Sequence, residues 1–165
     1  MIANEAIPLS LYIHIPWCVR KCPYCDFNSH QADSSGIPEE EYLAALFKDL
    51  EQLLHRIWGR RISTIFFGGG TPSLLSAETV SALLSGIRAR VPCIPALEVT
   101  MEANPGSLEA GKFQQFRDAG ITRLSLGVQS FNDQSLQALG RIHDAEQAHS
   151  AIQSVINCQF DSYNI

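Results

Sequence analysis

The amino-acid sequence predicts an α/β fold built on a parallel sheet. Short apolar segments rich in strand-forming residues alternate with longer segments in which apolar residues recur at helical spacing. Helical crossovers between successive strands imply parallel pairing, because a short loop cannot return the chain for a parallel partner. Polar and glycine-rich motifs follow the strands at their carboxyl ends. Both folds that fit this order, a (β/α) barrel and an open doubly wound sheet, place their functional loops there.

Five strands are expected from apolar or alternating segments that end at turn-forming residues. The first alternates apolar and polar residues and ends at Pro16, whereas the second is a continuous apolar run before three glycines, typical of a buried parallel strand. The last alternates again and stops at Ile165, so we expect the sheet to be cut short within its fifth strand. The expected strands cover residues 9–15, 62–67, 97–101, 123–128 and 160–165.

Helices are expected in the intervening segments, where apolar residues recur every three or four positions. Pro38 and the acidic residues after it suit a first helical turn, because proline has no N–H to leave unpaired and the helix dipole favours negative charge there. Ser76 suits the N-cap of the next helix, and Pro92 ends that helix. The expected helices cover residues 38–57, 76–90, 107–119, 133–139 and 144–157.

Composition places the chain among globular proteins with one domain. Its 165 residues are 45% hydrophobic and 18% charged, unlike a disordered chain. The formal net charge of −5 gives no basic footprint for phosphates, so we expect no nucleic-acid partner. No segment reaches the roughly 20 apolar residues that span a bilayer, and the amino-terminal residues lack the features of a secretion signal. We therefore expect a cytoplasmic protein, with any membrane association made only through partners.

Three of the five cysteines lie within eight residues, on the loop after the first expected strand. A disulfide would leave one thiol over and suits an oxidising compartment. A zinc site would need a fourth ligand, such as His30 or Cys93. A 4Fe–4S cluster with one iron not bound by protein fits three thiolates on a loop. The run has the spacing C-x3-C-x2-C and reads Cys18-Val19-Arg20-Lys21-Cys22-Pro23-Tyr24-Cys25.

This run, with Tyr24 before its last cysteine, resembles the signature of radical S-adenosylmethionine (SAM) proteins. The wider sequence resembles the oxygen-independent coproporphyrinogen III oxidase family, and within it the HemW-like branch of haem chaperones. The resemblance implies a partial (β/α)6 barrel, similar to a TIM barrel. Residues 1–165 would then be the N-terminal part of one core domain, without the rest of the barrel or the C-terminal domain. The resemblance rests on residues 11–18, 25–28, 66–73, 102–106, 126–131 and 139–143.

The resemblance also implies roles for particular residues. Cys18, Cys22 and Cys25 would each bind one iron of a 4Fe–4S cluster, and the amino and carboxylate groups of SAM would chelate the fourth iron. Tyr24 would lie against the adenine, and Tyr12 would lie near the cluster or the methionine group.

The remaining SAM contacts are expected at the carboxyl ends of the later strands. Glycines allow a close backbone approach, with free N–H groups to meet a carboxylate. Taken singly, each of these residues is also compatible with an ordinary turn or surface position. The expected contacts are Gly69, Gly70 and Thr71 at the methionine end, Glu102 on the ammonium group, Gln129 by hydrogen bonding, and Arg141 on the carboxylate.

For the whole protein, the resemblance implies binding of haem or a porphyrin, haem transfer to acceptor proteins, and a reductant for the cluster. The oxidases of the family carry a further cysteine two positions after the third, where this chain has Phe27. That difference favours the haem chaperone branch and leaves no catalytic residue assigned. The alternatives are oxidative decarboxylation of coproporphyrinogen III by a 5′-deoxyadenosyl radical and a structural zinc module.

Overall fold

A computed structural model describes residues 7–33 and 36–165 of the chain. Residues 1–6, part of the segment considered for a secretion signal, and residues 34–35 lie outside the described chain, as do the side chains of residues 107 and 108. Within the described ranges no helix is both long and apolar enough to cross a membrane.

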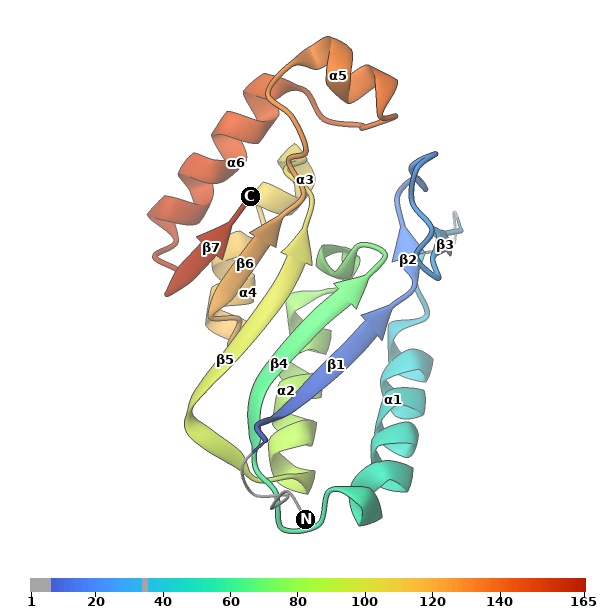
Figure 1. Cartoon of the computed structure of the whole chain (residues 1–165), viewed down its shortest axis with the longest axis vertical. Helices are drawn as coiled ribbons and strands as arrows, with labels where there is room; N and C mark the ends of the chain where they lie inside the picture. Colours follow the sequence, from blue (N-terminus) through green and yellow to red (C-terminus); the bar gives the residue numbers. More distant parts are fainter. Residues whose placement is uncertain (1–6, 34–35) are drawn as a thin grey trace.

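The fold is organised around one five-stranded sheet in which all neighbouring strands run parallel, in the order β1-β4-β5-β6-β7. Figure 1 shows all five arrows pointing the same way, with helices behind the sheet and at its sides and with α5 (Asp133–Ala138) beyond the arrowheads. This arrangement confirms the predicted parallel α/β fold. The strands are β1 (Leu9–Ile15), β4 (Ile62–Gly69), β5 (Cys93–Ala103), β6 (Arg123–Leu126) and β7 (Ser162–Asn164).

The register of the sheet brings the strands' carboxyl ends together. Ile15 at the end of β1 pairs with Gly69 at the end of β4, and Ala103 at the end of β5 pairs with Leu126 at the end of β6. The loops that leave these strands therefore start from one edge, at the top of Figure 1. The expected clustering of the sequence motifs at one edge is confirmed.

Helices and short 3₁₀ turns connect the strands at the predicted places. Ser76 caps α2 by accepting a hydrogen bond from the N–H of Thr79, as expected. Asp144 and Gln147 form a capping box at the start of α6. The helices are α1 (Glu39–Leu53), α2 (Ala77–Arg90), α3 (Ser107–Ala110), α4 (Phe113–Ala119), α5 (Asp133–Ala138) and α6 (Ala145–Asn157), with 3₁₀ turns η1 (Leu54–Arg56) and η2 (Pro72–Leu74).

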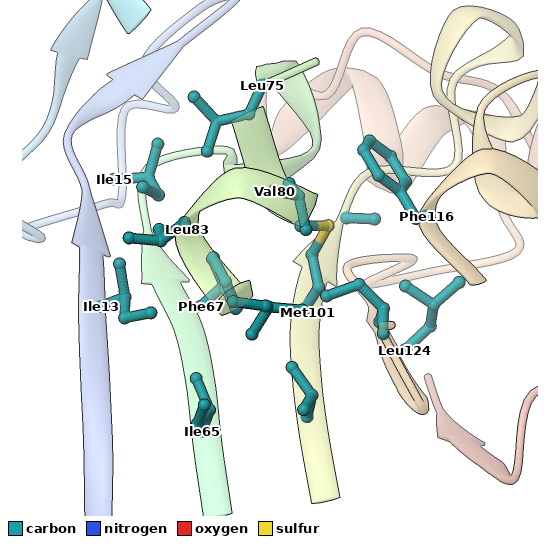
Figure 2. Packing of buried hydrophobic residues seen from close by; sticks show 14 of the residues in the cluster. Ile13, Ile15, Ile65, Phe67, Leu75, Val80, Leu83, Met101, Phe116 and Leu124 are labelled. Atoms are coloured by element: carbon teal, nitrogen blue, oxygen red, sulfur yellow. The ribbon is translucent and has the colours of Figure 1, made fainter. Parts of the chain in front are cut away.

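The hydrophobic core lies between the sheet and the helices that cover one of its faces. Figure 2 shows Ile13, Phe67 and Met101 on three neighbouring strands pointing toward Val80 and Leu83 of α2. Each of these side chains is at most 5% exposed. Burying such a side chain contributes about 1.5–3 kcal/mol, so this layer supplies the main stabilisation of the sheet edge that carries the loops.

Strand β5 begins at Cys93 and not at residue 97, which corrects the sequence prediction. Its register against β4 is interrupted, because Cys93 pairs with Ile62 and the next pair joins Glu98 to Thr64. Pro95 lies in this irregular stretch. Since proline has no N–H to donate to a neighbouring strand, within a central strand it is tolerated at such bulges. Its presence makes the first residues of β5 unlike a strand in the sequence.

The single helix expected over residues 107–119 is two helices, α3 and α4, separated by Gly111 and Lys112. Glycine in a helix interior is about 1 kcal/mol less favourable than alanine, which explains a break at this position. Strand β4 extends to Gly69 and β6 ends at Leu126, each two residues from its predicted boundary. A small sheet of β2 (Trp17–Cys18) and β3 (His30–Gln31) was not predicted.

The capping box of α6 gives a first prediction. Asp144→Ala in the intact protein is expected to lower the free energy of unfolding by about 1 kcal/mol, because the N–H of Gln147 loses its acceptor. Chemical denaturation measures this change. Asp144→Asn preserves the cap and should cost little, so equal losses in the two variants would contradict the assigned role.

Candidate functional site

A cavity of about 390 Å³ lies at the carboxyl edge of the sheet. Its walls come from the cysteine loop after β1, the ends of β4, β5 and β6, and the segment after α5. All of the predicted site residues except Tyr12 line it. The residues so placed are Cys18, Cys22, Tyr24, Cys25, Gly69, Gly70, Thr71, Glu102, Gln129 and Arg141.

The cysteine loop is fastened at both ends to backbone. His30 N–H donates to Pro16 O at 2.8 Å, and Ala32 N–H donates to Cys18 O at 2.9 Å. Cys18, on β2, is 8% exposed, and Cys22 and Cys25 are half-buried. The three cysteines thus line the cavity from a loop whose path is set by hydrogen bonds.

A single zinc ion is the alternative occupant of the cysteine loop. Among the described residues, no three Cys, His, Asp or Glu side chains lie close enough to hold one ion together. A zinc ion needs ligands that converge on one point, whereas a 4Fe–4S cluster takes one thiolate per iron. Cys93 begins β5, at the opposite end of the sheet from Cys18, and His30 does not line the cavity. Cys93 is therefore not at the site, whereas His30 lies on β3 beside Trp17, the residue before Cys18.

The glycine turn passes directly beneath the cysteine loop. Gly70 N–H donates to Ile15 O at 2.6 Å, and Thr71 N–H donates to Trp17 O at 2.7 Å. A Cβ on Gly70 would lie 2.5 Å from Trp17 O and 3.0 Å from Cys18 Sγ, too close for any side chain. The close backbone approach that the glycines were predicted to allow is therefore an approach of Gly70 to the start of the cysteine loop.

The expectation of free N–H groups at this turn is wrong. Gly69 N–H donates to Glu102 Oε2 at 3.2 Å, and the two amides that follow are bonded to backbone carbonyls. Gly69 also has a φ of +114°, a conformation that side chains other than glycine rarely allow. The turn therefore positions its neighbours and offers the cavity none of these three amides.

Glu102 is a partly buried carboxyl group on the cavity wall. Burial raises its pKa above the ordinary value, and the hydrogen bond from Gly69 N–H opposes that rise. The same carboxylate lies near Tyr12, whose pKa is raised by burial and, to a smaller degree, by the charge of Glu102. Glu102 can present a negative charge or a carboxyl proton to a ligand in the cavity.

Tyr12 is 56% exposed and lies outside the cavity lining. Its hydroxyl is 2.9 Å from His14 Nδ1, and His14 Nε2 is 2.7 Å from Asn28 O. Because a carbonyl oxygen only accepts, Nε2 carries the proton and Nδ1 accepts from the tyrosine. Tyr12 is therefore linked to the end of the cysteine loop through His14, and its contact with a cofactor stays a prediction.

Arg141 joins the loops around the cavity. Its Nη2 donates to Asn104 Oδ1 and to Gly127 O, both at 2.6 Å. Its Nη1 lies 3.5 Å from Cys22 Sγ and 3.4 Å from Tyr24 Oη. Its Nε is buried and has no hydrogen-bond partner within the described part of the chain. One guanidinium thus touches the cysteine loop and two strand ends and keeps a donor available.

Asn104 is a site residue that the sequence reasoning did not single out. Its amide accepts from Arg141 and donates from Nδ2 to Thr71 Oγ1 at 3.2 Å, so it couples the ends of β4 and β5 to the segment after α5. The available signal was its place directly after a strand, two residues past Glu102. Its partners are distant in sequence, and only the fold reveals them.

The donor set fits a 4Fe–4S cluster and an amino acid ligand. Three thiols, a carboxyl group and an arginine line the same cavity, and the arginine has a buried N–H without a partner. Thiolates suit iron, the carboxyl group suits an ammonium, and the guanidinium suits a carboxylate. Phe27, also on the cavity lining, is 59% exposed and adds an apolar surface.

Comparison with known proteins identifies relatives over nearly the whole chain. Residues 12–165 match the Radical SAM superfamily. The chain is 52% identical over 162 residues to "Heme chaperone HemW" of Haemophilus influenzae and 50% identical over 158 residues to that of Escherichia coli. Each alignment covers 96% of this chain and 42% of the relative. The chain thus spans less than half the length of these curated relatives.

A solved structure shares the fold. Coproporphyrinogen III oxidase (HemN) from Escherichia coli, described as a radical SAM enzyme, superposes with a TM-score of 0.84 at 31% sequence identity. The match covers 96% of this chain and 36% of that one. This likeness confirms the partial barrel-like architecture expected from the sequence.

The glycine turn gives a matched pair of variants. Gly70→Ala in the intact protein is expected to lower the free energy of unfolding by about 1–3 kcal/mol, because the new methyl group overlaps Trp17 O. Gly127→Ala, in the same cavity, meets its nearest atoms only at 3.4 Å and should stay within about 0.5 kcal/mol of the unmodified protein. Denaturant unfolding compares them, and equal effects would contradict the close approach.

Glu102 gives a pH-dependent prediction. A carboxyl group with a raised pKa binds more protons when folded, so its contribution to stability is lost as pH rises through that raised pKa. Glu102→Gln in the cluster-free protein should therefore increase the free energy of unfolding at neutral pH, with the increase disappearing below the ordinary pKa of 4.5. Glu98→Gln, exposed on the same strand, is the control. An unchanged pH profile for Glu102→Gln would count against the burial argument.

Proposed function

The chain belongs to the radical SAM superfamily, and from that premise we propose that it is the cluster-binding core of a haem chaperone. Membership implies a 4Fe–4S cluster and SAM. The observation that carries the proposal is one cavity in which three loop cysteines, Glu102 and Arg141 meet. The identity of 52% and 50% to two heme chaperones supports the haem function of the whole protein.

Each wall of the cavity has a distinct part in this proposal. Cys18, Cys22 and Cys25 would hold three irons, leaving the fourth for SAM. Glu102 would bind the ammonium group and Arg141 the carboxylate, using Nε, the donor that its other contacts leave. When bound and reduced, the cluster would supply one-electron chemistry to SAM.

Tyr24 and Gln129 would complete the SAM site. Burial raises the pKa of the Tyr24 hydroxyl, opposed by Arg141 and reinforced by Cys22, so the phenol stays protonated at neutral pH. Its ring, half exposed beside the cysteines, suits stacking on adenine. Gln129 also lines the cavity and would hydrogen-bond the ligand through its amide.

Phe27 favours the chaperone over an oxidase. The side chain at this position is an exposed apolar ring on the cavity lining, where a cysteine would offer a thiol. The likeness to coproporphyrinogen III oxidase, with 31% identity and a TM-score of 0.84, favours oxidative decarboxylation as the second candidate function. The structural zinc module is less favoured, because Cys93 lies at the opposite end of the sheet.

The proposal extends to partners and location. Haem acceptor proteins would receive the haem, and a cellular reductant would supply the cluster with electrons. Five free cysteines suit the reducing cytoplasm, where thiolates stay available for iron. Contact with membranes would come through acceptor proteins that reside there.

Reconstitution with iron and sulfide tests the cluster. Under anaerobic conditions, the intact protein is expected to bind a 4Fe–4S cluster, measured by iron analysis and by EPR after reduction. Single alanine variants of Cys18, Cys22 and Cys25 should each lose most of the cluster, because the site provides only three thiolates and each would bind one iron. Cys93→Ala is the matched control and should retain it. A full cluster in Cys18→Ala would refute the assignment.

Haem handling tests the function. The intact protein should bind haem and transfer it to a haem-free acceptor, followed by the absorbance of each protein. Incubation with coproporphyrinogen III, SAM and a reductant should give no decarboxylated product by mass spectrometry. Sustained product formation without haem transfer would select the oxidase instead.

A further inference from the structure

Gln129 adopts a backbone conformation that residues other than glycine rarely take. Its φ is +68°, and Gln159 is the only other non-glycine residue with a positive φ in the described ranges. Ser130 N–H donates to Val128 O at 2.9 Å, which places Gln129 at the centre of a three-residue γ-turn. A γ-turn with positive φ is strained and persists only where surrounding groups hold it.

Two side chains hold the carbonyls that precede this turn. The Val128 carbonyl, which already closes the turn, lies 3.1 Å from His143 Nε2. The Gly127 carbonyl accepts from Arg141 Nη2 at 2.6 Å. Arg141 and His143 thus form hydrogen bonds to the carbonyl oxygens of two successive residues. Arg141 belongs to the cavity wall, but His143 is 4% exposed and does not line the cavity.

The backbone around His143 is fixed on both sides. Gly140, with a φ of +71°, follows the end of α5, and the N–H of Arg141 donates to Leu136 O at 2.9 Å. Asp144 then caps α6. The imidazole therefore belongs to a short segment whose backbone is fixed between the end of α5 and the start of α6. A side chain on such a segment can restrain another loop.

The hydrogen bond of His143 has only one direction. A carbonyl oxygen accepts, so Nε2 must carry the proton. Burial lowers the pKa of His143, and the positive charge of Arg141 adds to this effect while Val128 O and Asp144 oppose it. The ring is accordingly neutral, and Nδ1 is buried with no partner among the described residues.

A packing role alone does not explain this histidine. Buried polar atoms are normally paired, and an apolar side chain of similar size would fill the space without leaving Nδ1 unpaired. The one hydrogen bond that the ring makes goes to the carbonyl that closes the strained turn. The free-energy cost of burying Nδ1 without a partner is therefore accounted for by the bond that Nε2 makes at the turn around Gln129.

We propose that His143 is a positioning residue, whose Nε2–H bond to Val128 O holds the turn that presents Gln129 to the cavity. This role rests on the proposed function, in which SAM is the ligand that Gln129 meets in the cavity. The restraint on the turn is a property of the cluster-free chain as well, so it can be measured separately.

Hydrogen exchange of the Ser130 amide tests the restraint in the cluster-free intact protein. His143→Leu should speed this exchange about three- to tenfold, the factor that follows from losing one hydrogen bond. His143→Gln, which keeps an N–H donor on a side chain of similar reach, should restore the slow rate. His55→Gln, exposed on η1 at the other end of the sheet, is the matched control and should change nothing.

SAM affinity supplies the second readout. After cluster reconstitution, His143→Leu should raise the Kd for SAM about three- to tenfold with unchanged iron content, and His143→Gln should reverse the loss. A folded His143→Leu protein with unchanged Ser130 exchange overturns the proposal. If the unmodified protein binds no SAM, the proposed function fails, while Ser130 exchange still decides the role of His143.

If His143→Leu does not fold, a second substitution still tests the proposal. Glycine tolerates a positive φ, so Gln129→Gly relieves the turn of its strain. If His143→Leu alone does not fold, adding Gln129→Gly should recover a cooperative unfolding transition. Continued failure of the double variant would mean that His143 stabilises something other than this turn, and the proposal would be wrong.

Discussion

The close packing of the glycine turn against β2 is the constraint on which the site depends. Gly70 and Thr71 donate their amide protons to Ile15 O and Trp17 O, and the space left cannot hold a Cβ at Gly70. Because Cys18 follows Trp17 directly, these two hydrogen bonds set where the first thiol lies relative to the sheet. The other cavity walls then follow from strand register, which aligns the ends of the parallel strands.

Much of this arrangement could be predicted from sequence, because it depends on local patterns and on one topological rule. Alternating strands and helices predict parallel pairing, and parallel pairing places the motifs of each strand end at one edge. The boundaries of β5 and of the split helix were less predictable, since Pro95 and Gly111 act through a bulge and a break that local propensity does not specify. The β2–β3 pair is held by two backbone hydrogen bonds of the cysteine loop and has no hydrophobic periodicity to reveal it.

The polar network of the site was the least predictable part. Asn104 and His143 act on groups far away in sequence, through bonds to Arg141 and to Val128 O, so neither has a recognisable partner in the linear chain. Arg141 was predicted as a ligand contact, and the structure adds its links to Asn104, Gly127 and Cys22. Hydrogen bonds to a charged group contribute about 1.5–3 kcal/mol each, so the guanidinium also stabilises the protein that it equips for binding.

The engaged amides of the glycine turn have a consequence for how such a site can diversify. A backbone N–H that binds a ligand remains a donor whatever side chain its residue carries, except proline. Here the three amides of residues 69–71 are committed to holding the chain together, so under the proposed function recognition would pass to the side chains of Glu102, Gln129 and Arg141. Glu102 and Arg141 also hold the scaffold through their bonds to Gly69 and Gly127, whereas the Gln129 side chain makes no hydrogen bond among the described residues. Position 129 is therefore where ligand preference can evolve with the least change to the fold.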